Sequence, residues 1–407
     1  MANSFKLIYT VNGVELTDIS QKFGVNQFTH TSDIYGTAET HYIKIADPSF
    51  DIAEKLYLFG GESIEYQYGY SGGQLSSRKT ATVFKYYPEF TANGAILHII
   101  GCDDRIKAHI GVKNRSFSQL RRSDIVRRIA AENNLTPVVE DTIGNDTFSQ
   151  LWTSDMQFLL DEVLPGSISA STGRGDYFLY IEDGNILHYH TPDYKPNVYR
   201  RFTVGRDGDI IRFVPSFCPD LSAALGGDQL CGIGYDPLNK VRLKFIAEDN
   251  TTGEKELAGR RTKINPKPQL ADFKRVFIDT SDNIFEVTAE TKYRYYTALQ
   301  VKYMAELYYQ GDPNVKVGTI VEVLVPKPNG GMHYSSGKYL VHGVYNTMTD
   351  AGSFLTKLIL SRNSAIEGDE ELNGIIRRVT VPQAQSPISN TVPSDTNTIE
   401  KIAQELD

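Results

Sequence analysis

Residues 311–362 constrain the fold of this chain more than any other stretch. Three short runs, at 320–325, 338–344 and 353–360, alternate apolar and polar residues. A Pro- and Gly-rich break at 326–331 separates the first run from the second. Period-two alternation of β-branched and aromatic residues, with turn residues between the runs, is typical of consecutive antiparallel strands. The stretch therefore predicts a β-meander.

A similar order of turn residues occurs in the amino-terminal part of the chain, which suggests an internal repeat. The set Asp47-Pro48, Gly61, Gly72-Gly73 and Gly94 parallels the set Asp312-Pro313, Gly318, Gly330-Gly331 and Gly352. The spacings differ by several residues, and two unrelated β-meanders could share such turns by chance. We expect a duplication that gives two similar β domains in one chain.

Residues 311–362 resemble the second barrel of the phage tail and baseplate hub proteins, a family that includes the late control protein D and the amino-terminal part of the type VI secretion spike protein VgrG. The resemblance lies in a Gly-Asp-Pro start at 311–313, a Gly-Lys-Tyr-Leu-Val strand at 337–341 and a closing strand. That strand carries Phe354, Thr356, Leu358, Leu360 and Arg362. The resemblance implies a mainly β fold with an α/β insert: two similar tail-tube-like β-barrel domains, an α/β domain between them and a small β insertion in the second barrel.

The middle of the chain changes to helical periodicity, as the α/β domain requires. Ile125, Val126, Ile129 and Ala130 share one helical face, which ends at 133–134. Ser154 with Gln157 predicts the cap of a second helix, and an aromatic hairpin with a turn at 183–184 follows. This order is similar to that of the hub insert, although Trp152 stands where the family commonly has a polar residue.

These patterns predict five segments. They are a first barrel at 1–112, an α/β domain at 113–196, a second barrel at 197–217 and 292–365, an inserted β-rich subdomain at 218–291 and an extended C-terminal tail at 366–407. Within the insertion we expect a strand at 276–287. Residues 297–309 fit either a helix or a strand.

Composition excludes several classes of protein. The net charge of -8 over 407 residues argues against wrapping nucleic acid, which requires a basic face. Three cysteines without a Cys-x-x-Cys pair favour a reducing compartment. No apolar run approaches a membrane span of about 18 residues, and the first residues lack a signal-peptide core. We expect a soluble chain made in the host cytoplasm.

The sequence offers one weak metal site and no catalytic one. His188 and His190 lie on one face of a predicted strand, with Asp193 nearby, but two imidazoles on an exposed strand are usually only solvated. No nucleophile elbow or zinc-protease motif is present. We therefore expect no catalytic residue, no cofactor and no enzymatic activity.

Two sets of residues are candidates for binding protein partners. One is a basic cluster on a predicted helix, whose alternative reading is an ordinary solvated face. It contains Arg121, Arg122, Arg127 and Arg128. The other is a short apolar and basic segment in a tail too polar to build a core, which we read as a linker that reaches a partner. It contains Ile375, Ile376, Arg377, Arg378 and Val379.

The resemblance implies a structural role in the virion tail baseplate. A trimer of two-barrel chains would form a pseudo-six-fold ring that joins the six-fold tail tube to the three-fold central spike and lets DNA pass. Its partners would be further copies of itself, the tube protein, the central spike or tip protein, the baseplate wedge proteins and the C-terminus of the tape-measure protein. The alternative is a carbohydrate-binding or cell-wall-degrading component of a tail tip, in which Tyr66, Tyr68 and Tyr70 stack on sugars.

Overall fold

The computed structural model of the chain is mainly β, as predicted. It describes residues 5–16, 25–34, 38–47, 50, 52–56, 58–71, 73–92, 94–103, 105–183, 185–192, 197–217, 229–248, 275–278, 283–300, 303–328, 330–333, 335–348 and 353–362. Within these ranges, no helix combines the length and apolar character of a membrane span.

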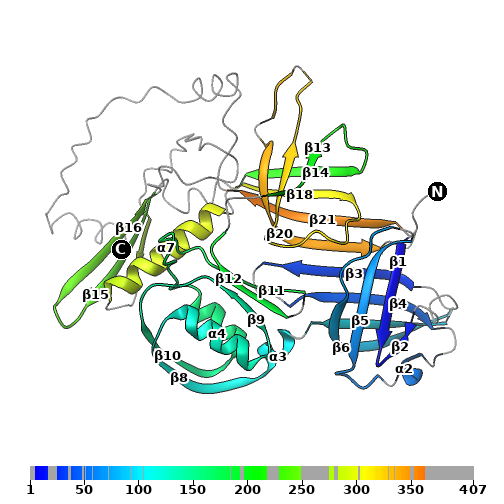
Figure 1. Cartoon of the computed structure of the whole chain (residues 1–407), viewed down its shortest axis with the longest axis horizontal. Coiled ribbons are helices and arrows are strands. Elements are labelled where there is room, and N and C mark those ends of the chain that lie inside the picture. The colour runs from blue at the N-terminus through cyan, green and yellow to red at the C-terminus, as the bar shows by residue number, and fades with distance from the viewer. Residues whose placement is uncertain are drawn as a thin grey trace.

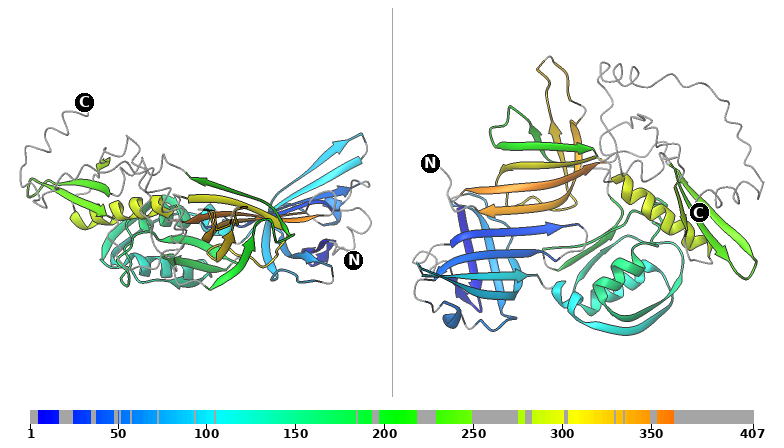
Figure 2. Two further views of the ribbon diagram at one scale, coloured as in Figure 1. Left: turned by 90° about the horizontal axis from the view of Figure 1, so that it is seen from above. Right: turned by 180° about the vertical axis from the view of Figure 1, so that it is seen from behind.

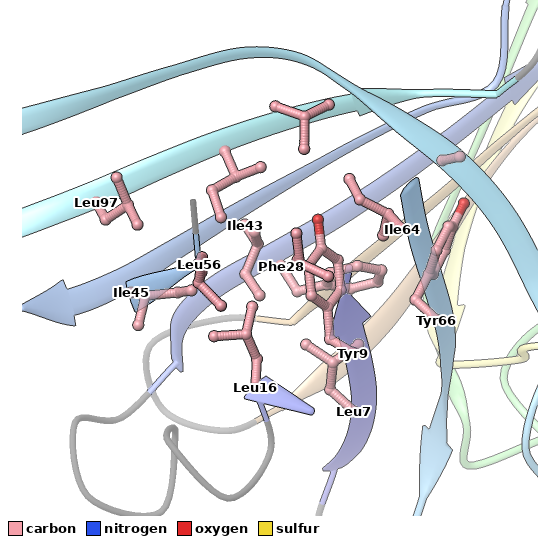
Figure 3. Packing of buried hydrophobic residues seen from close by; sticks show 14 of the residues in the cluster. Leu7, Tyr9, Leu16, Phe28, Ile43, Ile45, Leu56, Ile64, Tyr66 and Leu97 are labelled. Atoms are coloured by element: carbon pink, nitrogen blue, oxygen red, sulfur yellow. The ribbon is translucent and has the colours of Figure 1, made fainter. Parts of the chain in front are cut away.

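The amino-terminal strands wrap around a single apolar core, which Figure 3 shows from close by. Buried and partly exposed side chains alternate along the strands, as expected for a sheet with one face on a core. The predicted hairpin turn at Asn12 and Gly13 is confirmed, because both residues have positive φ. The elements are β1 (Phe5–Val11), β2 (Val14–Glu15), β3 (Val25–Asp33), β4 (Thr40–Asp47), α2 (Ile52–Lys55), β5 (Ser63–Tyr70), β6 (Lys79–Thr91) and β7 (Gly94–Cys102).

A unit of helices and short sheets follows, with its own apolar core. The hydroxyl of Ser154 accepts the N–H of Gln157, so the predicted helix cap is present. One sheet pairs β8 with β10, and the other has the order β11-β12-β9. The elements are α3 (Arg105–Ile110), β8 (Val112–Leu120), α4 (Arg122–Glu132), β9 (Thr136–Val139), β10 (Asp146–Ser154), α5 (Asp155–Phe158), the π-helical turn η1 (Leu159–Val163), β11 (Phe178–Glu182) and β12 (Ile186–His190).

The carboxy-terminal strands enclose a third apolar core. The last of them ends in Arg362, which is buried, lies over the Tyr339 ring and donates to the carbonyl of Ser336. The strands are β13 (Val198–Thr203), β14 (Ile210–Phe217), β18 (Tyr303–Gln310), β19 (Ile320–Leu324), β20 (Gly337–Met348) and β21 (Phe354–Arg362).

Between β14 and β18 the chain forms a three-stranded sheet and a long helix. They are β15 (Gln229–Asp236), β16 (Val241–Glu248), β17 (Arg275–Ile278) and α7 (Ile284–Gln300). The predicted strand at 276–287 is wrong in its second half, since α7 begins at Ile284. Val287, Thr291 and Tyr295 are buried at four-residue spacing, which is the period of a helix. The ambiguous stretch 297–309 contains the end of α7 and most of β18.

The first and last groups of strands belong to one continuous sheet, which we call the shared sheet. Its main path runs β14-β18-β21-β20-β3-β4-β7-β6-β5-β1-β2, and β20 pairs antiparallel with β3. Figure 1 shows these strands side by side from β14 to β6, with β5 and β1 turning across them. We call the elements from α3 to β12 the α/β unit, and β15, β16, β17 and α7 the α7 module. The two views of Figure 2 place both on the same side of the shared sheet. The two barrels are therefore joined by backbone pairing rather than by a flexible linker.

Candidate functional site

Eight neighbouring strands, which start at the β14 end of the shared sheet, divide into two halves with the same order. In the first half the order is β3-β4-β7-β6, and in the second it is β14-β18-β21-β20. When the four strands of each half are numbered along the chain, both halves have the order first, second, fourth, third. The third strand of the second half, β20, pairs with the first strand of the first half, β3.

The two halves also agree in register. A bulge lies between Val83 and Lys85 in β6 and between Val341 and Gly343 in β20. The Gly61 N–H donates to the Val83 carbonyl at 2.9 Å, and the Gly318 N–H donates to the Val341 carbonyl at 2.8 Å. The first strands of the two halves, β3 and β14, match too. Their bulges lie between Val25 and Gln27 in β3 and between Ile210 and Arg212 in β14. This agreement supports the predicted internal repeat at the level of single residues.

One part of the repeat departs from this correspondence. β1 pairs antiparallel with β5, whereas β13, which has the same place in the second half, pairs parallel with β19. The halves are therefore equivalent in these eight strands and differ where each sheet turns over its own core.

The junction between β20 and β3 is closed by buried polar side chains. The amide of Asn346 donates to the Tyr68 hydroxyl at 3.1 Å, and the same hydroxyl lies 3.1 Å from Nδ1 of His30. The Thr356 hydroxyl donates to the side-chain carbonyl oxygen of Asn346. Buried polar groups of this kind require a specific geometry, so the junction has one defined register.

The two ends of the eight-stranded path lack this cover. Beyond Val83, β6 pairs only with β7, and β14 pairs only with β18, among the residues that the structure describes. Large apolar side chains are exposed at these edges: Phe84 at 57%, Phe90 at 68% and Ile211 at 60%. Exposed apolar residues beside an unpaired strand edge indicate an interaction surface.

The face of the shared sheet that points away from the cores carries two pairs of side chains that join a carboxylate to a Lys or His nitrogen. Lys357 lies 2.8 Å from Glu306 and over the rings of Tyr308 and Tyr345. The hydrogen bond between them lowers the pKa of Glu306 and raises that of Lys357. In the other half, Nε2 of His98 lies 2.9 Å from Glu89, and its ring stacks on Tyr87.

The hairpin turn between β11 and β12 ties the α/β unit to both barrels. Asp183 contacts Lys79 at 3.2 Å and Lys316 at 2.7 Å, and Lys316 also contacts Glu182. Burial alone would raise the pKa of Asp183, but the two ammonium groups hold it below its usual value. A pocket of about 120 Å³ adjoins these groups. Because every charge here contacts an opposite charge, we interpret the cluster as a structural tie.

The predicted basic cluster is not one surface. Arg122 is buried and donates to the carbonyls of Glu162 and Val163, so it does not lie on the exposed helix face that was expected to meet a partner. Arg127 pairs with Asp124 and Asp141, and Arg128 pairs with Glu132 across one helical turn. Arg121 precedes α4 and is exposed.

The other candidates give a mixed outcome. The apolar and basic segment at 375–379 and Asp193 lie outside the described residues. His188 stacks on Tyr180 and contacts Glu182 at 2.9 Å, and Nδ1 of His190 lies 2.7 Å from the Thr191 carbonyl. Across the described part of the chain, no three His, Cys, Asp or Glu residues are grouped as metal ligands.

The tyrosines considered for sugar stacking lie mostly inside the first barrel. Tyr66 and Tyr68 are buried, and Tyr70 packs edge-on against Phe354. A platform for sugars needs exposed rings, so this observation removes the residues on which the carbohydrate alternative depended.

Sequence reasoning missed the two sheet edges. A signal was present in the sequence in Pro88, which lies within β6. Proline inside a strand indicates an edge. Pro215 gives the same signal in β14.

The fold can be compared with proteins of known structure. No family model matches the chain, and no curated protein matches it. A tail protein from Neisseria meningitidis covers 88% of this chain and 96% of its own length, at 14% identity and a TM-score of 0.61. The 43 kDa tail protein of prophage MuSo2 from Shewanella oneidensis covers 88% and 99%, at 14% identity and a TM-score of 0.60.

The chain has the fold of these phage tail proteins. An Escherichia coli component of the type VI secretion system, described as similar to the T4 bacteriophage tail proteins gp27 and gp5, covers 89% of this chain and 77% of its own length. Its identity is 8% and its TM-score is 0.52. The expected likeness in fold to phage tail and type VI secretion proteins is therefore confirmed.

Proposed function

We propose that the chain is a structural, non-enzymatic hub of a phage tail baseplate, which forms a homotrimeric ring between the tail tube and the central spike. One observation carries the proposal: among the described residues, the unpaired edges of the eight-stranded path are β14 and the part of β6 beyond Val83. β14 is the first strand of its half and β6 is the third strand of the other, so they are the counterparts of β3 and β20, which pair in the junction.

The junction inside one chain is therefore a template for the junction between chains. If β6 of one copy pairs with β14 of the next, every barrel contacts its neighbours through a third and a first strand. Such head-to-tail contacts produce a closed ring when the rotation per copy fits. Three copies give six barrels, which matches a six-fold tube on one face and a three-fold spike on the other. The ring would also cover every exposed edge of the eight-stranded path.

The lumen of this ring would be lined by the face of the shared sheet that points away from the cores. On that face Glu89 and Glu306 are each paired with a neighbouring side chain. Pairing with Glu306 neutralises the ammonium of Lys357, which reduces the positive charge that this wall would present to passing DNA. The wedge proteins and the C-terminus of the tape-measure protein remain further expected partners in the virion tail.

Native mass measurements test the proposal. The chain is measured alone and with the tube and spike proteins encoded beside it. A trimer, alone or with the spike, supports the hub. A chain that stays monomeric in every mixture contradicts it, and binding to peptidoglycan fragments would then favour the alternative role.

A further inference from the structure

We propose that the seam between two copies, formed by β6 of one and β14 of the next, lacks its central backbone hydrogen bonds and is held mainly by aromatic side chains. The inference rests on the proposed ring and adds the register of its contacts and a reason for weak association between separate copies.

The template is the junction between β20 and β3. The Ile34 N–H donates to the His342 carbonyl at 2.9 Å, so the backbone of residue 342 faces β3. Because alternate residues of a strand face the same neighbour, Val344 and Asn346 face β3 as well. Asn346 stands opposite His30 in this ladder.

The matching bulges transfer this register to the free edges. Lys85 and Gly343 are the first residues after the bulges of β6 and β20, so three residues further on Pro88 occupies the position of Asn346. Arg212 and Gln27 follow the bulges of β14 and β3, so Pro215 occupies the position of His30. The two prolines would face each other across the seam.

A proline has no backbone N–H, so this pair cannot exchange the two hydrogen bonds that a non-proline pair would form. Prolines on exposed edges also discourage pairing with other strands. Pro88 and Pro215 therefore weaken the seam at its centre and keep separate copies from associating through their backbones alone.

Aromatic side chains supply the remaining contact. Phe90 occupies the position of Met348, and Phe213 that of Phe28, and Met348 stands opposite Phe28 in the junction. Met348 is 6% exposed and Phe28 0%, whereas Phe90, which stacks on Phe50, is 68% exposed. A second copy would cover Phe90 with Phe213 in the way that β3 covers Met348.

Disulfide trapping tests the register in the full chain. Glu89 and Val214 take the positions of Thr347 and Thr29. In the junction these two threonines stand opposite each other as a non-hydrogen-bonded pair. Such pairs have Cα atoms about 4.5 Å apart, which suits a disulfide. Under mild oxidation E89C/V214C should form linked trimers, whereas K85C/V214C, offset by about 13 Å along the strand, should not. A trimer in which only the control pair links, or in which neither pair links, contradicts the proposed register of the seam. The proposal that the chain forms a trimeric hub is not affected by that result.

Restoring the donors tests the role of the prolines. P88A/P215A adds two possible backbone hydrogen bonds per seam, and we expect half-assembly at a concentration at least about tenfold lower than for the natural chain. Pro137→Ala, an exposed proline of β9, is the control and should change nothing. Unchanged or weaker assembly of the double variant overturns the inference. Monomers for every variant, with the spike present, overturn the ring itself.

Discussion

The carboxylate of Asp183 lies 3.2 Å from the ammonium of Lys79, and this contact joins the α/β unit to the first barrel. Lys79 also lies 3.2 Å from Glu39, so one buried cation serves two carboxylates from different parts of the chain. Asp183 in turn reaches Lys316 of the second barrel. The position of the α/β unit on the shared sheet is thus fixed by ion pairs as well as by apolar packing.

Removing Lys79 should therefore destabilise the chain strongly. Lys79→Ala leaves Glu39 and Asp183 without their shared cation in a largely buried site, and we expect the free energy of unfolding to fall by about 3 kcal/mol. Lys316→Ala is the matched control, because its side chain is 42% exposed and its loss should cost less than about 1 kcal/mol. Denaturant unfolding of both variants measures the difference. Equal losses would contradict the assignment of Lys79 as the main tie.

Two buried histidines predict a loss of stability in mild acid. Burial lowers the pKa of His342 to about 4 and that of His41 to about 3. In the unfolded chain both titrate near about 6.5, so below that pH the unfolded state binds more protons. The stability that they contribute is complete above pH 6.5 and is lost progressively as the pH falls towards 4.

The share of His342 in this pH dependence of the free energy of unfolding can be measured separately. Between pH 6 and pH 5 each histidine should contribute about 1 kcal/mol, and His342→Gln should remove its share of the slope. Denaturant unfolding at both pH values gives the slope. In this range carboxyl groups contribute little to the slope, because their pKa values in the unfolded chain, about 3.9 to 4.3, lie below it. An unchanged slope in His342→Gln would show that this residue does not titrate as described.

The repeated glycines at the start of β5 and β19 give a matched pair of variants. Gly61 and Gly318 both have positive φ, so alanine strains either position by about 1 kcal/mol. At Gly318 an added Cβ would also lie 2.7 Å from the hydroxyl of Tyr180, which belongs to the α/β unit. We expect Gly318→Ala to lower the thermal midpoint further than Gly61→Ala. Equal shifts would mean that the Tyr180 hydroxyl moves away at no cost.

Arg122 is expected to act in folding. Its guanidinium forms an ion pair with Asp146 at 3.2 Å and donates to the carbonyl of Glu162 in the π-helical turn. Arg122→Ala should reduce the free energy of unfolding by about 3 kcal/mol, because it leaves buried carbonyls and a carboxylate without a donor. Arg128→Ala, on the exposed side of α4, should reduce it by less than about 0.5 kcal/mol. A stable Arg122→Ala chain with reduced partner binding would contradict this assignment.

Much of the fold could be predicted from the sequence because its signals are local. The turn at Asn12 and Gly13, the cap at Ser154 and the strands after residue 311 depend on residues that are close together in the chain. The α7 helix was missed because Val287, Thr291 and Tyr295 follow a run of β-branched and aromatic residues, which favours a strand when read alone.

The candidate site could not be predicted in the same way, because it depends on which strands are neighbours. The pairing of β20 with β3 joins residues more than three hundred positions apart, and no local pattern specifies it. Nor does composition show that Arg122 is buried while Arg128 is exposed. Pro88 and Pro215 were visible in the sequence, but their meaning depends on the register of the repeat.

The mass of the assembled chain tests the central claim most directly. Native mass spectrometry of the full chain, alone and with its spike and tube proteins, should show three copies per ring, and the spike should lower the concentration at which the ring forms. A ring with another number of copies, or a chain that remains monomeric with both partners present, would contradict the account.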